Sequence, residues 1–252
     1  MDILQSLLEH RSIRKYRSQQ IPELVLEKIL EAGVRASTTG NMQVYSIIVT
    51  TDQKNKESVA PFHFNQPLVS QAPLLLTFCA DFNRFNKWCK ARNAEPGYDN
   101  FLSFYTASID ALLVAQNVAV AAESFGLGIC YLGTTTYNAD KLIEFYQLPK
   151  GVVPVTTLAV GYPDEEPELT DRLSLKAVTH KEFYKDYSNQ DIDKIYKDKE
   201  SMNFYKKLVE ENKTETLAQI FTDKRYTKND NILFTQKFLN AIKDQGFMNN
   251  EE

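Results

Sequence analysis

The sequence predicts an α/β or α+β domain built around one sheet. Segments with the apolar spacing of helices alternate with short apolar runs that are typical of strands. The chain has 252 residues, of which 43% are hydrophobic and 25% charged, an ordinary globular balance with enough length for a large core. No G-x-G-x-x-G follows a strand and opens a helix, so a Rossmann dinucleotide fold is not expected.

Helices and strands follow one another from the N-terminus. A short helix ends at Leu8, and the segment 12–16 is extended. Pro22 opens a second helix, because its fixed φ suits a first helical turn. The runs 44–51 and 72–81 are predicted strands. The second is so continuously apolar that we expect a sheet buried on both faces.

The longest apolar segment, Phe101–Phe125, is rich in alanine and apolar on nearly all sides. This pattern predicts a long helix buried in the middle of the protein. Aromatic residues near its start (Phe101, Phe104 and Tyr105) either fill the core or line a pocket. Its most apolar window, 110–123, is too short to span a bilayer, so no membrane role is expected.

The remaining elements complete the sheet and lead into a polar tail. The segments 128–133 and 152–163 are predicted strands, separated by a helix with Asn138 as its N-cap. Pro154 within the second strand indicates an edge or a bulge. From His180 onward polar residues dominate, but two stretches keep helical spacing, so we expect a helical tail that packs on the main body or on a partner subunit.

Composition excludes several classes of function. The net charge of -4 gives no general support for binding nucleic acid or a membrane surface. Three cysteines and three histidines lack metal-type spacing, so no metal is expected, and the odd cysteine count fits a reducing cytoplasm. No apolar run follows the N-terminal basic cluster, so no signal peptide is expected. Neither a nucleophile elbow nor a P-loop is present.

A concentrated basic patch, HRSIRKY, begins at His10 of this acidic chain. In an extended segment, residues two apart point the same way, so His10, Ser12 and Arg14 share one face. Arginine forks and a hydroxyl suit a phosphate group. The alternative is a solvated charge run at a helix exit, where cations are favoured anyway. Spacing alone leaves both interpretations open.

Three further motifs have a functional and a structural interpretation. The segment 36–43, with its small hydroxyl residues and glycine, either lets backbone amides approach a ligand or is an ordinary loop. The segment 121–133 either touches a flat ligand through its glycine-flanked strand or only connects a helix to a strand. Arg172 either pairs with Asp171 or Glu168, or reaches a phosphate.

Taken together, the order and spacing of these motifs resemble the nitroreductase family. The resemblance rests on HRSIRKY, RASTTGNMQVYSIIVTTD, CADFNR, AQNVAVAAESFGLGICYLG and VGYPDEEPELTDRLS, in family order. Within the family, the chain most resembles the oxygen-insensitive NADPH nitroreductases and the NADPH–flavin oxidoreductases. The resemblance runs from about Ile3 to about Tyr187, and the last sixty or so residues match poorly.

The resemblance implies an α+β nitroreductase-like fold. Its central, mostly antiparallel sheet is wrapped by helices, with a long buried central helix and a C-terminal helical extension. Residues 1–187 would form the FMN-binding domain, and residues 188–252 an extension that packs on the core or on the partner subunit. FMN would lie between the two subunits of a homodimer, with NADPH or NADH as electron donor.

The resemblance also implies the residues that contact FMN. The segment 10–14 would grip the phosphate and ribityl chain, the loop before the first strand would run beside the flavin, and the strand end near Gly133 would lie over the ring. No side chain is assigned as a certain acid or base, because the chemistry belongs to the flavin. The matching positions are His10, Arg11, Ser12, Ile13, Arg14, Thr38, Thr39, Gly40, Gln43, Gln66, Tyr131, Leu132, Gly133, Thr134 and Arg172.

Two departures from the family pattern affect these expectations. Thr170 replaces a phosphate-binding lysine and Asp171 adds a negative charge beside Arg172, so weaker FMN retention is predicted. The family's arginine-bearing tail loop is acidic here, with Lys224 and Arg225 as the nearest cations, so the choice between NADPH and NADH stays open.

The expected activity is ping-pong electron transfer from NAD(P)H to a nitroaromatic, a quinone or free flavin. Two alternatives stay open. The first is a flavin reductase that supplies reduced flavin to another enzyme. The second is a flavin-binding protein with little turnover.

Overall fold

The computed structural model describes residues 3–249, and the chain divides into two compact units. The sheet unit comprises the chain up to Glu168 together with the segment from Phe234 onward. The helical unit comprises Leu169–Leu233. The proposed division into an FMN-binding domain over 1–187 and an extension over 188–252 is a statement about function and stays a prediction.

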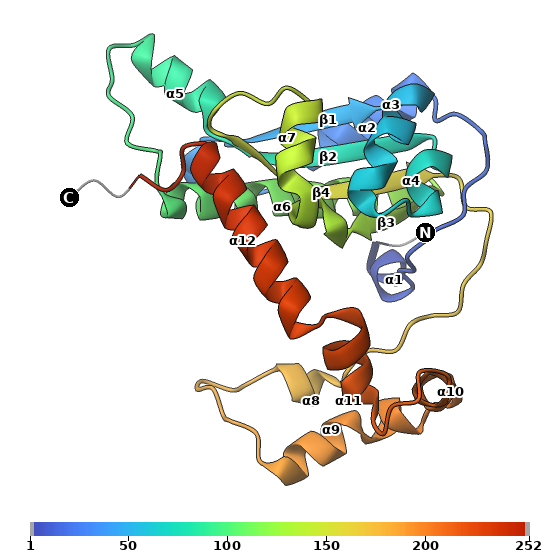
Figure 1. Cartoon of the computed structure of the whole chain (residues 1–252). Helices are drawn as coiled ribbons and strands as arrows, with labels where there is room; N and C mark the ends of the chain where they lie inside the picture. The colour runs from blue at the N-terminus through green and yellow to red at the C-terminus, as the bar shows by residue number, and fades with distance from the viewer. Residues whose placement is uncertain (1–2, 250–252) are drawn as a thin grey trace. The chain divides into compact units, whose positions relative to one another are not determined.

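A four-stranded antiparallel sheet forms the centre of the sheet unit (Figure 1). Its order is β1-β2-β4-β3, so β1 and β3 are the edge strands. All four predicted strands are confirmed within one or two residues of their expected ends. They are β1 (Tyr45–Thr50), β2 (Leu74–Asp81), β3 (Gly128–Leu132) and β4 (Val152–Gly161).

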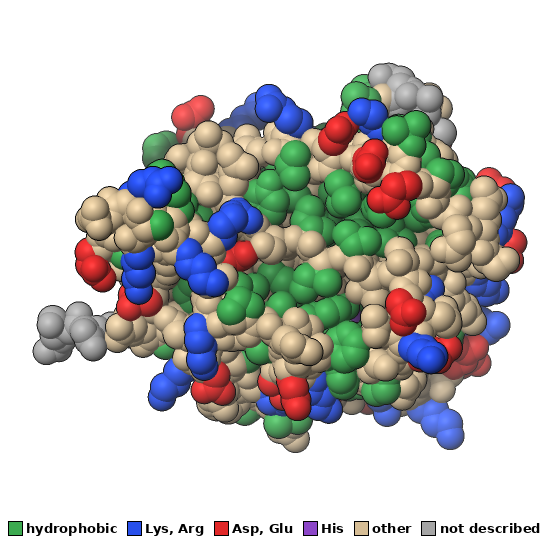
Figure 2. Space-filling model, turned by 90° about the horizontal axis from the view of Figure 1, so that it is seen from above, with side chains coloured by type: hydrophobic (Ala, Val, Ile, Leu, Met, Phe, Trp, Pro, Cys, Tyr) green, Lys and Arg blue, Asp and Glu red, His purple; other side chains and the backbone are tan. Residues whose placement is uncertain are grey.

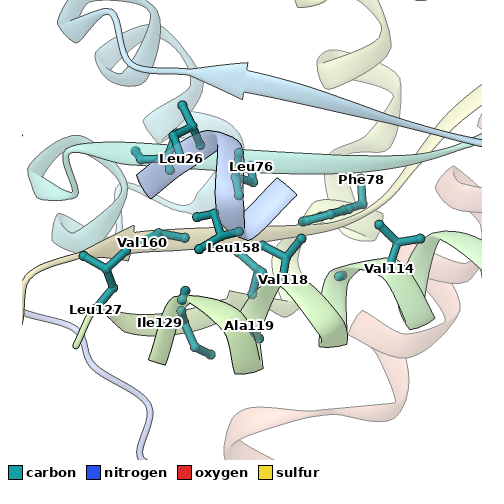
Figure 3. Close-up of a cluster of buried hydrophobic side chains, with 14 of the residues drawn as sticks. Leu26, Leu76, Phe78, Val114, Val118, Ala119, Leu127, Ile129, Leu158 and Val160 are labelled. Carbon is teal, nitrogen blue, oxygen red and sulfur yellow. The ribbon is translucent and has the colours of Figure 1, made fainter. Parts of the chain in front are cut away.

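Helices cover both faces of the sheet, which explains why every residue of β2 is buried. On one face α2 (Glu23–Gly33) and the long α6 (Phe101–Ser124) pack on alternate strand residues. Figure 3 shows this cluster, in which Leu76 and Phe78 meet Val114 and Val118. The other face packs against α3 (Gln53–Val59), the 3₁₀ turn η2 (Ala60–His63), α4 (Pro67–Gln71) and α7 (Ala139–Phe145).

Helix α6 buries one face and leaves an apolar stripe exposed on the other. The prediction of a long helix packed on the sheet is confirmed, and its inner face is buried against the sheet. The expected burial on nearly all sides is wrong, because Leu102, Leu112 and Leu113 are exposed in this chain. Of its aromatic residues, Phe104 fills the core, whereas Tyr105 is exposed. Its 24 residues are long and apolar enough to cross a bilayer by length and composition alone, but the buried face is that of a core helix.

The two prolines and the asparagine singled out in the sequence have defined places. Pro22 occupies the N-cap position of α2. Pro154 lies where the β2–β4 register shifts, and β3 pairs with β4 only as far as Thr157, so the expected bulge and the local edge are both present. Asn138 is the N-cap residue of α7, as predicted, although its side chain makes no capping bond to the helix. Its amide instead donates to the Phe62 carbonyl.

The shorter elements complete the sheet unit. The C-terminal part of α12 (Lys228–Asp244) buries Ile242 beside Phe104 of α6. Helix α5 follows β2 and was not predicted from the sequence. The remaining elements are α1 (Ile3–Leu8), η1 (Thr39–Asn41), α5 (Asn83–Lys90) and η3 (Gly133–Asn138).

The helical unit has a small core of its own, formed by Tyr205, Leu217 and Ile220. Its helices confirm the helical spacing of the tail. Capping boxes start two of them, at Ser188 and at Thr216. The elements are α8 (Leu175–Val178), α9 (Asn189–Ser201), α10 (Asn203–Glu211), α11 (Leu217–Gln219) and the π-helical η4 (Ile220–Arg225).

Candidate functional site

The basic segment His10–Arg14 runs along the edge strand β3. The Ile13 amide donates to the Ile129 carbonyl at 2.9 Å, and Ser12 forms a parallel bridge with the same residue. The Ile13 side chain lies against Gly128, where a Cβ would stand 2.5 Å from Ile13 Cγ1. Only glycine therefore lets the segment approach the strand this closely.

Tyr16, the last residue of HRSIRKY, fixes the other end of this segment. Its buried hydroxyl donates to the Ile13 carbonyl at 2.6 Å and lies 3.1 Å from the Ala159 carbonyl of β4. Burial raises the pKa of this phenol far above its usual range, so Tyr16 stays a neutral donor. The segment is thus attached to two strands of the sheet.

A cavity of about 590 Å³ lies beside the basic segment and is lined in part by His10, Arg11 and Glu123. His10 Nδ1 stands 2.5 Å from a carboxylate oxygen of Glu123. The Nε of Arg11 is buried and has no hydrogen-bond partner among the residues that the structure describes. A buried guanidinium nitrogen without an acceptor is costly, so this nitrogen is suited to bind an acceptor such as an anion.

Glu165 binds the backbone of the same segment. One carboxylate oxygen of Glu165 accepts from the amides of Arg14 at 2.6 Å and Lys15 at 3.1 Å. The Arg14 side chain is exposed and lies 3.4 Å from the Ser12 carbonyl. A negative group is therefore already bound at two consecutive amides. The side chains of His10, Arg11 and Arg14 are therefore the groups that remain for binding an additional anion.

The far end of β3 carries the segment Tyr131–Thr134. The Tyr131 hydroxyl donates to Gln116 of α6 at 3.2 Å, and burial, aided by the nearby Glu123, raises its pKa to about 12. Leu132 is buried, whereas Gly133 is exposed, and a Cβ there would meet no atom within 4 Å. The backbone at Gly133 therefore faces open space in which a flat ligand could lie.

Gln66 and Thr134, which lie far apart in sequence, meet at His63. The Thr134 hydroxyl lies 2.8 Å from His63 Nδ1, and the Gln66 amide donates to the His63 carbonyl at 3.1 Å. His63 is 1% exposed, and burial lowers its pKa to about 4, so it is neutral at pH 7. Sequence reasoning did not identify His63, because a lone histidine in a short irregular segment carries no motif.

The loop from Thr38 to Gln43 leads into β1, at the sheet edge opposite β3. Thr39 donates to the buried Asp110 of α6 through its amide, at 2.9 Å, and its hydroxyl, at 3.2 Å. Gly40 and Gln43 line a cavity of about 970 Å³ together with Trp88 of α5. The positions of the sheet unit that match the flavin site are thus divided between its two edges.

Arg172 belongs to the helical unit, and neither of the acidic partners considered for it forms an ion pair with it. Its guanidinium donates to the backbone carbonyls of Thr170 at 3.3 Å and Asp171 at 3.0 Å. The Asp171 carboxylate instead bonds Lys199 at 2.8 Å and Tyr205 at 2.5 Å. Partial burial by itself would raise the pKa of Asp171, but these two hydrogen bonds outweigh it and lower that pKa. The negative charge expected beside Arg172 is therefore compensated by Lys199.

A helix-covered antiparallel sheet with a basic segment along its edge strand defines a nitroreductase-like α+β fold. The chain belongs to the nitroreductase family, whose model matches residues 7–162.

Three relatives illustrate the similarity. FMN reductase (NADPH) of Bacillus subtilis is 36% identical over 183 residues, which are 72% of this chain and 74% of the relative. NADPH-flavin oxidoreductase of Vibrio harveyi is 31% identical over 221 residues, 88% of this chain and 90% of the relative. A crystal structure of a candidate oxidoreductase from Bacteroides fragilis is 50% identical, with a TM-score of 0.95, and covers 99% of this chain and all of its own. This structural match extends over the tail.

Proposed function

We propose that the protein is an FMN-dependent NAD(P)H oxidoreductase that reduces small molecules such as nitroaromatics, quinones or free flavin. The observation that carries the proposal is the buried, unpaired Nε of Arg11 within a basic segment. Directly after the edge strand β3, along which this segment runs, Gly133 leaves its backbone open to a flat ligand. FMN combines a phosphate with a flat ring, and two relatives with names that include FMN or flavin are 36% and 31% identical to this chain.

The residues present fit FMN. His10, Arg11 and Arg14 would bind the phosphate, with Arg172 as a further candidate from the helical unit. When bound there, FMN would supply the redox chemistry, which is hydride acceptance from reduced nicotinamide and two-electron transfer to the acceptor. NADPH is the donor that both named relatives use, and NADH stays an open alternative for this chain.

The chain's own residues orient the ring and hold protons in place. The neutral His63 fixes the Thr134 hydroxyl, and Gln66 is held beside it with its amide near the same oxygen, at 3.5 Å. Hydrogen-bond donors that are fixed before the reaction stabilise developing charge without reorganising. Gln66 and Thr134 are therefore the side chains we assign to the polar edge of the flavin, and neither acts as a strict acid or base.

A homodimer is part of the proposal. Helix α6 exposes an apolar stripe in this single chain, and the short α1 exposes most of its apolar residues as well. On the face seen from above, on the side of the edge strand β1, Figure 2 shows a further gathering of hydrophobic side chains with charged side chains around them. Exposed apolar patches of this kind mark interaction surfaces. The exposed residues are Ile3, Leu4, Leu7, Leu8, Leu102, Tyr105, Ile109, Leu112 and Leu113.

The split of the matched positions between two sheet edges supports the same arrangement. The loop Thr38–Gln43 lies at β1 and the segments His10–Arg14 and Tyr131–Thr134 lie at β3. Three strand spacings separate these edges, about 14 Å, so two subunits can bring them together more readily than one. The three cysteines are free and buried, which fits the cytoplasmic location we propose.

Flavin reduction for the benefit of another enzyme is the second candidate, and the names of the two curated relatives favour it. The discriminating assay compares the rate of NADPH oxidation after free FMN or a nitroaromatic is added. A larger stimulation by free FMN identifies a flavin reductase.

The visible absorption spectrum of the purified protein tests the proposal directly. Flavin bands that bleach with anaerobic NADPH or NADH support the redox enzyme and identify its donor. Bands that persist with both cofactors contradict the proposed activity and leave a flavin-binding protein. An absence of bands after incubation with FMN contradicts the flavin site itself.

A further inference from the structure

The loop Thr38–Gln43 has an unusual backbone. Gly40, Asn41 and Gln43 all have left-handed φ angles, at 56°, 56° and 54°. Two of these three residues are not glycine, and side chains with a Cβ disfavour this region. Such a conformation persists only where the surrounding structure fixes it.

Asp110 fixes the start of the loop from inside the protein. It is 1% exposed and lies on the buried side of α6. One of its carboxylate oxygens accepts both the amide and the hydroxyl of Thr39, which is the residue before Gly40. The other oxygen has no hydrogen-bond partner among the described residues. Burying a carboxylate oxygen without a partner costs folding free energy, which indicates that the hydrogen bonds of Asp110 to Thr39 have a role.

Arg84 fixes the end of the loop from α5. Its guanidinium donates to the Gln43 carbonyl and, at 3.3 Å, to the Tyr45 carbonyl. The Arg84 amide donates at 3.3 Å to Asp81, which also accepts a hydrogen bond from Ser46 at the start of β1. This arrangement explains the motif CADFNR, because Asp81 and Arg84 tie α5 to the loop and to the strand that follows it.

We propose that Asp110 and Arg84 are positioning residues that hold the loop Thr38–Gln43 in its left-handed conformation. The inference rests on the proposed function, since the loop carries four of the positions matched to the FMN site. Neither residue touches FMN in this scheme. Each acts through the loop, which reaches the flavin with its conformation already set, so that binding does not have to order it.

Variants of each residue separate positioning from charge and from general stability. Asp110→Asn keeps an oxygen that can accept from Thr39, whereas Asp110→Leu removes it. Arg84→Met removes both of its bonds to the loop. Lys56→Met is the matched control, because Lys56 is also a buried charged residue, donating to the Ala72 carbonyl at 2.7 Å on α3, away from the loop.

Two measurements are made on each apoprotein: the Kd for FMN from flavin fluorescence, and amide hydrogen exchange over residues 38–43. If the ordered loop falls to about a tenth of the population, the Kd rises about tenfold. We expect this rise in Kd, together with faster hydrogen exchange over residues 38–43, in Asp110→Leu and Arg84→Met. Asp110→Asn and Lys56→Met should stay within about threefold of the wild type, on the same scale.

Several results would overturn the inference. One is wild-type Kd and exchange in both Asp110→Leu and Arg84→Met. Another is an equal loss in Lys56→Met, which would make the effect one of general stability. Equal losses in Asp110→Asn and Asp110→Leu would make charge, not the anchored loop, responsible. If the wild type itself fails to bind FMN, the proposed function is refuted, and the exchange data alone still decide whether the two residues fix the loop.

Discussion

Replacing Gly128 with alanine is expected to displace the basic segment and weaken FMN binding. The new Cβ would stand 2.5 Å from Cγ1 and 2.7 Å from Cβ of Ile13. Carbon atoms pack best at about 3.5–4.0 Å, so Ile13 must retreat by about 1 Å. A rotamer change cannot provide this retreat, because the Ile13 Cβ is itself too close. The backbone must therefore move, and the Ile13 amide loses its bond to Ile129.

The size of the effect follows from this displacement. Overpacking of this kind costs about 1–3 kcal/mol of folding stability. In a chain of this length that lowers the Tm by about 2–12 °C. A shift of about 1 Å at a binding segment can weaken function by up to about 100-fold, and we expect the Kd for FMN to rise by at least tenfold.

The assay measures the Kd for FMN at a temperature where thermal melting shows the variant to be folded. Gly97→Ala is the control, because a Cβ at Gly97 meets no atom within 4 Å. A Gly128→Ala protein that loses stability but binds FMN like the Gly97→Ala control would refute the assignment of His10–Arg14 as the phosphate-binding segment.

Three other predictions test separate parts of the site. Thr170→Lys should tighten FMN binding about fivefold, because it restores a charge-assisted contact worth about 1 kcal/mol at an exposed position. An unchanged Kd in a titration would contradict this. Burial lowers the pKa of His63 from 6.5 to about 4, so His63 is protonated at a lower pH in the folded state than in the unfolded state. The contribution of His63 to the free energy of unfolding is therefore fully present above pH 6.5. It should fall by up to about 3 kcal/mol as the pH drops from 6.5 to about 4. The free energy of unfolding, measured by urea denaturation at several pH values, should fall with pH in the wild type and fall less steeply in His63→Asn. Equal slopes in the two proteins would count against a buried neutral imidazole. Leu112→Lys places a charge in the exposed stripe of α6 and should convert a dimer to a monomer in sedimentation experiments. A dimer that survives this change would place the interface elsewhere.

The sequence determined the identity and order of the main elements. Each strand is a mostly apolar run and the long helix 101–124 is mostly apolar, so the packing of these elements into one core could be predicted from the sequence pattern. The basic segment could also be found in the sequence, because its residues are contiguous. Helix α5 was missed, since it is short and polar and its bounds depend on packing.

Other features depended on contacts between residues that are distant in the chain. An all-round apolar pattern could not show that α6 buries one face and exposes Tyr105 and Leu112 on the other. Neighbouring charges suggested that Asp171 either pairs with Arg172 or weakens its site. The fold instead supplies Lys199, 28 residues further along the chain, and the carboxylate turns to it.

The sequence by itself therefore determined which segments could form a nitroreductase-like sheet and where its basic segment begins. Only the tertiary structure decided which groups hold that site. The contacts of Thr39 with Asp110 and of Thr134 with His63 each join residues 71 positions apart. Hydrogen bonds of this range leave no periodic pattern and no local motif, because their geometry is fixed by how the helices and strands pack.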